Sequence, residues 1–206
     1  MKGEKNKERP KDKAGPHDEQ KVSTLKDLLR DKPKRGRPRR MVARQNVYVV
    51  LNADQKAQMD ALAVRLPKGL GRPDLPDLAV SVLTARMEAL RTAVAGRTRE
   101  IPEGVTDLES LYLLWDVAPP PRAEHEAEEK WTSIRLSPQQ VLELGRLHGT
   151  LNAAFGANRS EVFALALALL VQFLDRHPLN EVEISLADVR EMIFREELAV
   201  GMRDQG

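Results

Sequence analysis

Cysteine is absent from this 206-residue sequence, which excludes disulfide bonds, thiolate metal sites and a cysteine nucleophile. The 4 histidines are scattered along the chain without the spacing of metal ligands. No glycine-rich phosphate loop follows a predicted strand, and none of the 31 acidic residues forms a pair in an apolar setting that would tune it for acid–base catalysis. We therefore expect a protein that is not an enzyme and that uses neither a metal nor a cofactor.

Long hydrophobic runs are missing as well. No apolar stretch reaches the roughly 18–20 residues needed to cross a bilayer, and the N-terminus has no signal-peptide core. Together with the absence of cysteine, this predicts a cytoplasmic protein without a membrane partner.

Charge is distributed unevenly, although the net charge of the whole chain is only +2. Residues 1–44 contain 16 Lys/Arg and 7 Asp/Glu, a net of +9, whereas the remainder contains 17 and 24, a net of −7. The first 31 residues have few branched apolar side chains and no aromatic ones, so they bury too little surface to offset the entropy of ordering. We predict a disordered basic arm over 1–43, joined to a mildly acidic body.

The most informative stretch is 130–177. Apolar and exposed positions alternate over 130–136, which predicts a strand with one buried face. A helix then starts after Ser137, and Asn158 with Glu161 makes a capping box for a second helix that is apolar almost all the way round. One strand and two helices are too little for a stable fold, so this strand needs a partner.

A second stretch, 44–94, repeats the same order of elements 85 residues earlier. Side chains alternate again over 46–51, and under the 85-residue offset the segment from Asp74 to Asp77 falls within one residue of the second capping box. Residues 68–73 lengthen the first inter-helix turn. Such an internal duplication predicts that the two strands pair antiparallel within one chain.

Strand–helix–helix with this pattern resembles the ribbon-helix-helix DNA-binding fold of the Arc, MetJ and CopG repressors. The resemblance depends on residues 133–144 and 158–162. It implies a mainly α fold with a short two-stranded antiparallel ribbon, here a tandem ribbon-helix-helix pseudo-dimer: copy 1 over 44–94 and copy 2 over 130–177. In that family the ribbon enters the major groove, outward side chains read base edges, and the start of the second helix holds phosphate. By resemblance the base-reading residues are Asn46, Tyr48, Val50, Trp131, Ser133 and Arg135, and the phosphate-binding residues are Asn158, Arg159 and Ser160.

The chemistry of these side chains agrees with such roles, and each has a simpler alternative. Arginine offers guanine a bidentate fork and asparagine suits adenine, but Arg135 also fits an exposed salt bridge. Val50 suits a thymine methyl group, or contributes little to reading. Trp131 either covers the ribbon end or packs into it, and capping alone explains Asn158. In copy 1, acidic residues stand where phosphate should bind, which counts against tight binding by that half.

The basic arm contains Arg-Gly-Arg-Pro, which resembles an AT-hook. Glycine and proline keep such a segment slim and extended, so arginines can enter the narrow, negative minor groove of A·T tracts. The alternatives are a phosphate-binding tail and a solvated linker. The candidate minor-groove residues are Arg35, Gly36, Arg37, Pro38, Arg39 and Arg40.

Two further segments complete the chain. The connection over 95–129 has helical spacing that predicts a short helix laid on the body, with Trp115 as a core residue. In the extension over 178–206, Ser185 and Asp188 fit the cap of a last helix, which either packs on its own module or mediates assembly.

We therefore expect a sequence-specific protein for double-stranded DNA, most simply a transcriptional repressor. An alternative is an accessory protein of plasmid or mobile-element transfer or partition, because similar single-chain tandem proteins serve conjugal and T-DNA transfer. A further alternative is an antitoxin-like protein-interaction module. Because the two strands differ, the target need not be palindromic. Possible partners besides DNA are a second copy of the chain and a DNA-processing protein.

Overall fold

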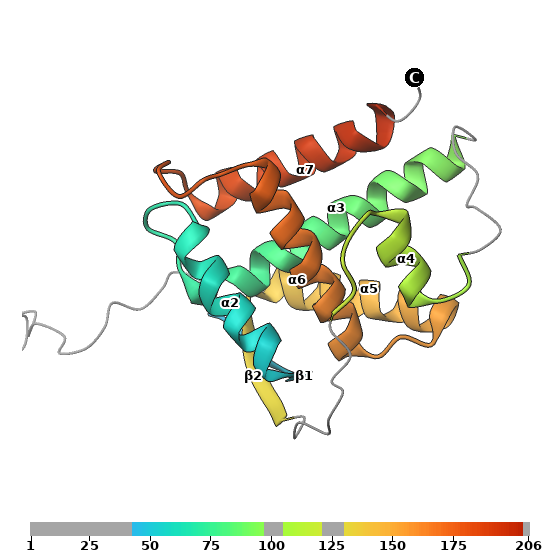
Figure 1. Ribbon diagram of the computed structural model, residues 1–206, viewed down its shortest axis with the longest axis horizontal. Helices are drawn as coiled ribbons and strands as arrows, with labels where there is room; N and C mark the ends of the chain where they lie inside the picture. The colour runs from blue at the N-terminus through green and yellow to red at the C-terminus, as the bar shows by residue number, and fades with distance from the viewer. Residues whose placement is uncertain (1–42, 97–104, 121–129, 204–206) are drawn as a thin grey trace, which may run out of the picture. The chain divides into compact units, whose positions relative to one another are not determined.

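The computed structural model describes residues 43–96, 105–120 and 130–203, and within these ranges the fold is mainly helical with a two-stranded antiparallel sheet, as predicted (Figure 1). The predicted AT-hook segment and parts of the 95–129 connection lie outside these ranges. The described elements are β1 (Gln45–Leu51), α2 (Ala53–Arg65), the 3-10 helix η1 (Arg72–Asp74), α3 (Leu75–Ala95), α4 (Leu108–Leu114), β2 (Lys130–Leu136), α5 (Pro138–Phe155), α6 (Arg159–Arg176) and α7 (Leu186–Arg203).

The two strands form a ribbon with one buried and one exposed face. On the inner face Val49 and Leu136 are fully buried, because alternate side chains of a strand point to opposite sides. The antiparallel register runs from Gln45 opposite Leu136 to Leu51 opposite Lys130. Both predicted strands therefore exist, and they pair with each other as expected.

The register of the ribbon is centred on two equivalent residues. Strand β1 starts at 45 and β2 at 130, an offset of 85, and Tyr48 lies directly opposite Ser133, which is also 85 residues away. The 85-residue offset therefore relates each cross-strand pair on one side of this centre to a pair on the other side. The pair Asn46–Arg135 is the counterpart of the pair Val50–Trp131.

The helices that follow each strand repeat the same order. Helices α2 and α5 start at 53 and 138, again 85 apart, and α3 and α6 start at 75 and 159, which is 84 apart. The second offset is one residue shorter because of the helix and connection lengths. Helix α2 has 13 residues and is followed by nine linking residues (66–74), whereas α5 has 18 and is followed by three (156–158). Gly156 ends α5 with φ 71°, a conformation that glycine adopts without steric cost.

The core lies between the ribbon and the two long apolar helices. Helix α3 packs against α5, α6 and α7, and α6 also contacts β1. Phe163 and Phe173 of α6 are fully buried, and each such side chain contributes about 2–3 kcal/mol by leaving water. Helix α6 is apolar almost all the way round because other elements pack against it on several sides.

Helix α4 packs on the body of the protein, as the spacing of its apolar residues predicted. Leu111, Tyr112 and Trp115 are buried, and Gln172 Nε2 donates hydrogen bonds to the carbonyls of Trp115 at 2.9 Å and Asp116 at 3.1 Å. The interpretation of Trp115 as a core residue is confirmed.

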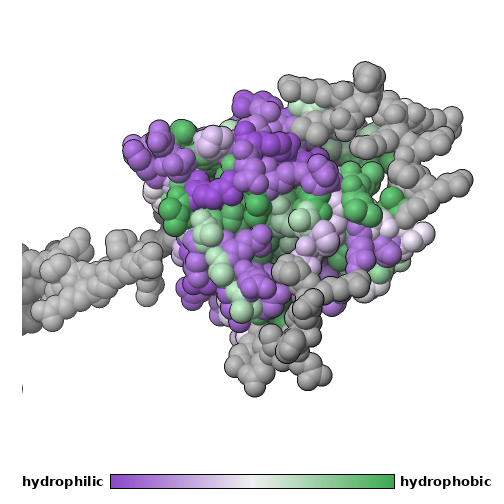
Figure 2. Space-filling model, viewed as in Figure 1, coloured by the Kyte–Doolittle hydropathy of each residue, from purple (hydrophilic) through white to green (hydrophobic). Residues whose placement is uncertain are grey.

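Helix α7 lies alongside α3 (Figure 1). Ser185 and Asp188 cap it reciprocally, because the Ser185 amide donates to Asp188 Oδ2 at 3.1 Å and the Asp188 amide donates to Ser185 Oγ at 3.2 Å. Val189 and Ile193 are buried, whereas Figure 2 shows mainly hydrophilic residues along the exposed side of α7. Helix α7 therefore packs against α3, which belongs to the first predicted copy, and a role in assembly stays a prediction.

A membrane-spanning helix must be long and apolar enough to cross the hydrocarbon layer, and the described helices fall short of this. No single one is both long and apolar enough to cross a bilayer. Helices α5 and α6 meet the criterion only as a pair, with a bend of 108° between them, by length and composition alone.

Candidate nucleic-acid interface

The outer face of the ribbon carries all six side chains predicted to read bases. Tyr48 is 60% and Trp131 72% exposed, and Asn46, Ser133 and Arg135 are exposed as well. Val50, the sixth residue of this face, is partly covered. They form three cross-strand pairs along the outer face: Asn46–Arg135, Tyr48–Ser133 and Val50–Trp131.

The two ends of this face differ in chemistry. At one end Arg135 Nε donates a hydrogen bond to Asn46 Oδ1 at 3.3 Å, so a guanidinium and an amide stand together. At the other end Val50 faces Trp131, which leaves an isopropyl group beside an indole. One end therefore offers several hydrogen-bonding groups, and the other mainly apolar surface.

The start of α6 adjoins the Val50 end of the ribbon. The Ser160 hydroxyl oxygen accepts a hydrogen bond from the Val50 amide at 2.8 Å, which fixes α6 to β1. Asn158 Oδ1 accepts from the amides of Ser160 at 2.9 Å and Glu161 at 3.1 Å, and Glu161 Oε2 accepts from the Asn158 amide at 2.7 Å. Three helix-terminal amides are thus bonded by the capping box that the sequence predicted.

Among the three predicted phosphate-binding residues, Arg159 has a different geometry. Asn158 and Ser160 are used by the cap and by the contact with β1, whereas Arg159 is exposed. Its guanidinium is unpaired within the part of the chain that the structure describes. An anion near this helix end would gain from the helix dipole and from the Arg159 charge together.

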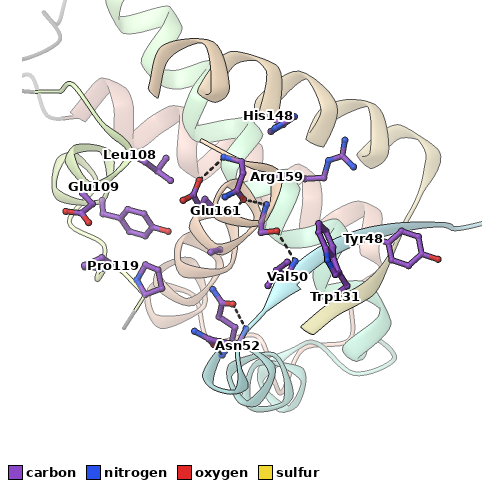
Figure 3. Close-up of a pocket in the computed structure, with 16 residues that line it drawn as sticks. Tyr48, Val50, Asn52, Leu108, Glu109, Pro119, Trp131, His148, Arg159 and Glu161 are labelled. Carbon is purple, nitrogen blue, oxygen red and sulfur yellow. Dashed lines mark hydrogen bonds between the residues drawn. The ribbon is translucent and has the colours of Figure 1, made fainter. Parts of the chain in front are cut away.

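A groove of about 1130 Å³ connects the start of α6 with the ribbon (Figure 3). In the close-up Arg159, Trp131 and Tyr48 lie toward one side of it, with Glu109 and other residues of the α4 region toward the other. Sequence reasoning did not assign several of its lining residues to a site, namely Asn52, Gln55, Leu108, Tyr112, Pro119 and His148. Burial raises the pKa of the Tyr112 phenol, with a smaller contribution from the charge of Glu161, so this phenol stays neutral.

The equivalent helix start in the first half of the chain is closed by acidic residues. Asp74 and Asp77 are buried, and Arg44 Nη2 pairs with Asp74 Oδ1 at 2.7 Å and with Asp77 Oδ2 at 3.2 Å. Asp77 Oδ1 also accepts a hydrogen bond from the Ser137 amide at 2.9 Å. The acids noted in the sequence thus bind the chain's own groups at the helix start that corresponds to the start of α6.

Burial is the largest influence on Asp77. It raises the pKa of this carboxyl above the ordinary value, and the Ser137 amide and the Arg44 and Arg190 charges oppose the rise without cancelling it. A carboxylate held in this way is a poor site for a second anion, because phosphate would add like charge to a partly dehydrated position.

The described residues contain no candidate metal-binding site, because no three or more His, Asp or Glu side chains among them lie close enough to bind one metal ion. His148 lines the groove, and the His177 ring lies 4.8 Å from that of Phe173. The six arm residues, Arg35, Gly36, Arg37, Pro38, Arg39 and Arg40, lie outside the described ranges.

Comparisons with known proteins add no further information, because no protein-family model, no curated protein and no solved structure matches this chain. The assignment of the interface therefore depends on its own geometry. The relevant features are an exposed two-stranded face, an adjoining helix start with the exposed Arg159, and the groove between them.

Proposed function

We propose that the chain is a single-chain tandem ribbon-helix-helix protein, which binds duplex DNA by placing the outer face of the β1–β2 ribbon in the major groove. The observation that carries this proposal is the register of the ribbon. Tyr48 and Ser133 face each other and are 85 residues apart, which is the register expected if two copies of one strand–helix–helix unit pair as the subunits of a symmetric dimer do. The major groove is about 12 Å wide and admits a two-stranded ribbon.

Base recognition follows from the side chains of the outer face. Arg135 suits the O6 and N7 atoms of guanine, and Asn46 suits the N6 and N7 atoms of adenine. Their 3.3 Å hydrogen bond uses only the Nε of Arg135, so the terminal guanidinium nitrogens remain for a base. The inner face is buried, which fixes the backbone from which these side chains project.

Backbone binding is assigned to the start of α6. Because Asn158 and Glu161 already bond the first amides, phosphate is held there by the Arg159 guanidinium and the helix dipole more than by unpaired amides. Phosphate contacts position the protein and carry no sequence information of their own. The arm residues Arg35 to Arg40 are proposed to add minor-groove or phosphate contacts.

Two biological roles suit such a protein. The first is repression, in which the protein occupies a promoter. The second is an accessory role in plasmid or mobile-element DNA transfer or partition. The antitoxin alternative is weakened by α7, whose apolar residues Val189 and Ile193 are already buried within the chain.

The proposal is tested by selecting from a randomised duplex library at two salt concentrations with the full-length protein. Arg135→Ala should relax one position of the selected motif at a cost of roughly 1–3 kcal/mol. Deletion of residues 1–41 should lower the dependence of affinity on salt while keeping the motif. Arg91→Ala is the matched control, because Arg91 is exposed near the far end of α3 and pairs with Glu88 at 2.7 Å.

A motif-free wild type together with an unchanged Arg135→Ala protein contradicts the proposal. In that case the search moves to a protein partner that co-purifies in stoichiometric amounts.

A further inference from the structure

We infer that the two ends of the ribbon recognise DNA in different ways. The Asn46–Arg135 end reads base edges by hydrogen bonds, and the Val50–Trp131 end binds by apolar contact next to a single backbone anchor. This inference rests on the proposed DNA-binding function and specifies how the target of the same face is recognised. It predicts a target with one strongly specified half.

The pseudo-twofold register allows each outer residue to be compared with its counterpart. The 85-residue offset makes Trp131 the counterpart of Asn46 and Arg135 the counterpart of Val50. In a symmetric dimer both ends would carry the same pair of side chains. Here the pairs are amide with guanidinium at one end and isopropyl with indole at the other.

Only the first pair is able to distinguish bases by a pattern of hydrogen bonds. Arginine has five N–H donors in a fixed fork and asparagine has both a donor and an acceptor, whereas valine has none and tryptophan has a single donor. The Arg135–Asn46 hydrogen bond also orders both side chains before binding, which reduces the entropy lost on contact with DNA. Val50 remains suited to a thymine methyl group.

The starts of α6 and α3, which adjoin the two ends of the ribbon, also differ in chemistry. Next to Val50, the start of α6 opens onto the groove and presents the exposed Arg159. Next to Arg135, the position that corresponds to Arg159 holds the buried Leu75, and Asp77 in the same helix turn accepts the Ser137 amide and pairs with Arg44. Within the described residues, the helix start at the apolar end therefore carries an arginine without a partner, whereas Arg72 at the other helix start pairs with Asp60 at 3.1 Å.

A role for Val50 and Trp131 in covering the core does not explain why Trp131 is so exposed. Trp131 is 72% exposed, so its indole shields little of the core. A large apolar side chain that stands in water on the face proposed to meet DNA gains most of its burial when that face is occupied.

The test is to restore the symmetry. The double variant Val50→Arg, Trp131→Asn gives the apolar end the side chains of the polar end at the counterpart positions. The Ser160 contact with residue 50 is kept in this variant, because the Val50 backbone amide makes it. Selection from a randomised duplex library compares the wild type, the double variant and Val64→Arg, a control that adds a guanidinium at an 80% exposed site on α2.

The wild type should select one half-site with defined guanine or adenine positions and a second half with at most a thymine preference. The double variant should select an inverted repeat of the defined half, and it should bind that repeat on the order of tenfold more tightly than the wild type does. Val64→Arg should select the wild-type motif. If the double variant loses its cooperative thermal unfolding, Trp131→Asn alone should still gain one defined position in the second half.

Two results would overturn the inference while leaving the proposed function intact. One is an inverted repeat selected by the wild type itself. The other is a folded double variant that keeps the asymmetric motif of the wild type. Failure of the wild type to bind any duplex rejects the proposed function instead, so the two failures are distinguishable.

Discussion

The Ser160 hydroxyl oxygen accepts a hydrogen bond from the Val50 amide at 2.8 Å, and this bond joins the start of α6 to β1. The two residues are 110 positions apart in the chain. The contact fixes the position of the α6 start relative to the ribbon. The same hydrogen bond therefore contributes to the stability of the fold and positions Arg159 beside the outer face.

Removing this hydroxyl should weaken the fold. Ser160→Ala leaves the Val50 amide without its acceptor in a partly buried position, which costs about 1–3 kcal/mol of unfolding free energy. Urea denaturation followed by circular dichroism measures the change. Ser160→Thr, which keeps the hydroxyl, should lose less than half as much, and equal losses for the two variants would contradict the contact.

The Glu197 carboxylate should be a strong determinant of how α7 is held. It is 0% exposed, pairs with Arg86, and lies 2.7 Å from Arg176 Nη2. Glu197→Ala leaves these two guanidinium groups without their shared carboxylate, so we expect a loss of about 3–5 kcal/mol in unfolding free energy. The neighbouring Glu196→Ala, which removes only a surface pair with Arg195, should change it by about 0.5 kcal/mol or less. Similar losses for the two variants would argue against a buried role for Glu197.

The raised pKa of Asp77 gives a pH dependence with a definite sign. Because the folded protein holds this proton more tightly than the unfolded chain, whose pKa stays near 3.8, the contribution of Asp77 to stability falls as pH rises through the raised pKa. Asp77→Asn does not titrate, and its side-chain oxygen still accepts the Ser137 amide. The unfolding free energy of Asp77→Asn minus that of the wild type should therefore increase from pH 3.5 toward neutral pH, as urea titrations at several pH values will measure. A difference that decreases over this range contradicts the assigned shift.

Arg159 should contribute affinity without specificity. Arg159→Ala should weaken binding to all duplexes by a similar factor and reduce the slope of log K against log salt concentration by about 1. Arg72→Ala is the matched control, since Arg72 is a half-exposed arginine at the other helix start and pairs with Asp60 at 3.1 Å. Fluorescence anisotropy over a series of salt concentrations measures the slope for each variant. An equal reduction of the slope in Arg159→Ala and Arg72→Ala would contradict the role of Arg159 as the phosphate-binding residue.

Much of this architecture is predictable from the sequence because it is encoded locally. Alternating side chains located both strands, and the Asn158–Glu161 pair located the start of α6, since each pattern reports a backbone conformation within a few residues. The duplication also predicted that the two strands pair, because one strand alone leaves its edge unsatisfied.

The remaining features depend on distant contacts and had no local signal. Arg44 stands next to a basic arm and was counted with it, whereas in the fold it pairs with Asp74 and Asp77 about 30 residues away. Glu197 follows two exposed or half-exposed charged residues, and nothing in that run distinguishes the buried one. The groove was missed because the spacing within α4 predicts an apolar face without naming the surface that it covers.

The most direct measurement of the central claim is protection of guanine N7, which lies in the major groove, from dimethyl sulfate on a selected duplex. The outer face of the ribbon should protect at least one guanine in the wild-type complex, and Arg135→Ala should lose that protection while it still binds at higher protein concentration. Unprotected guanines in a saturated wild-type complex, or protection that survives in Arg135→Ala, would contradict the placement of this ribbon in the major groove.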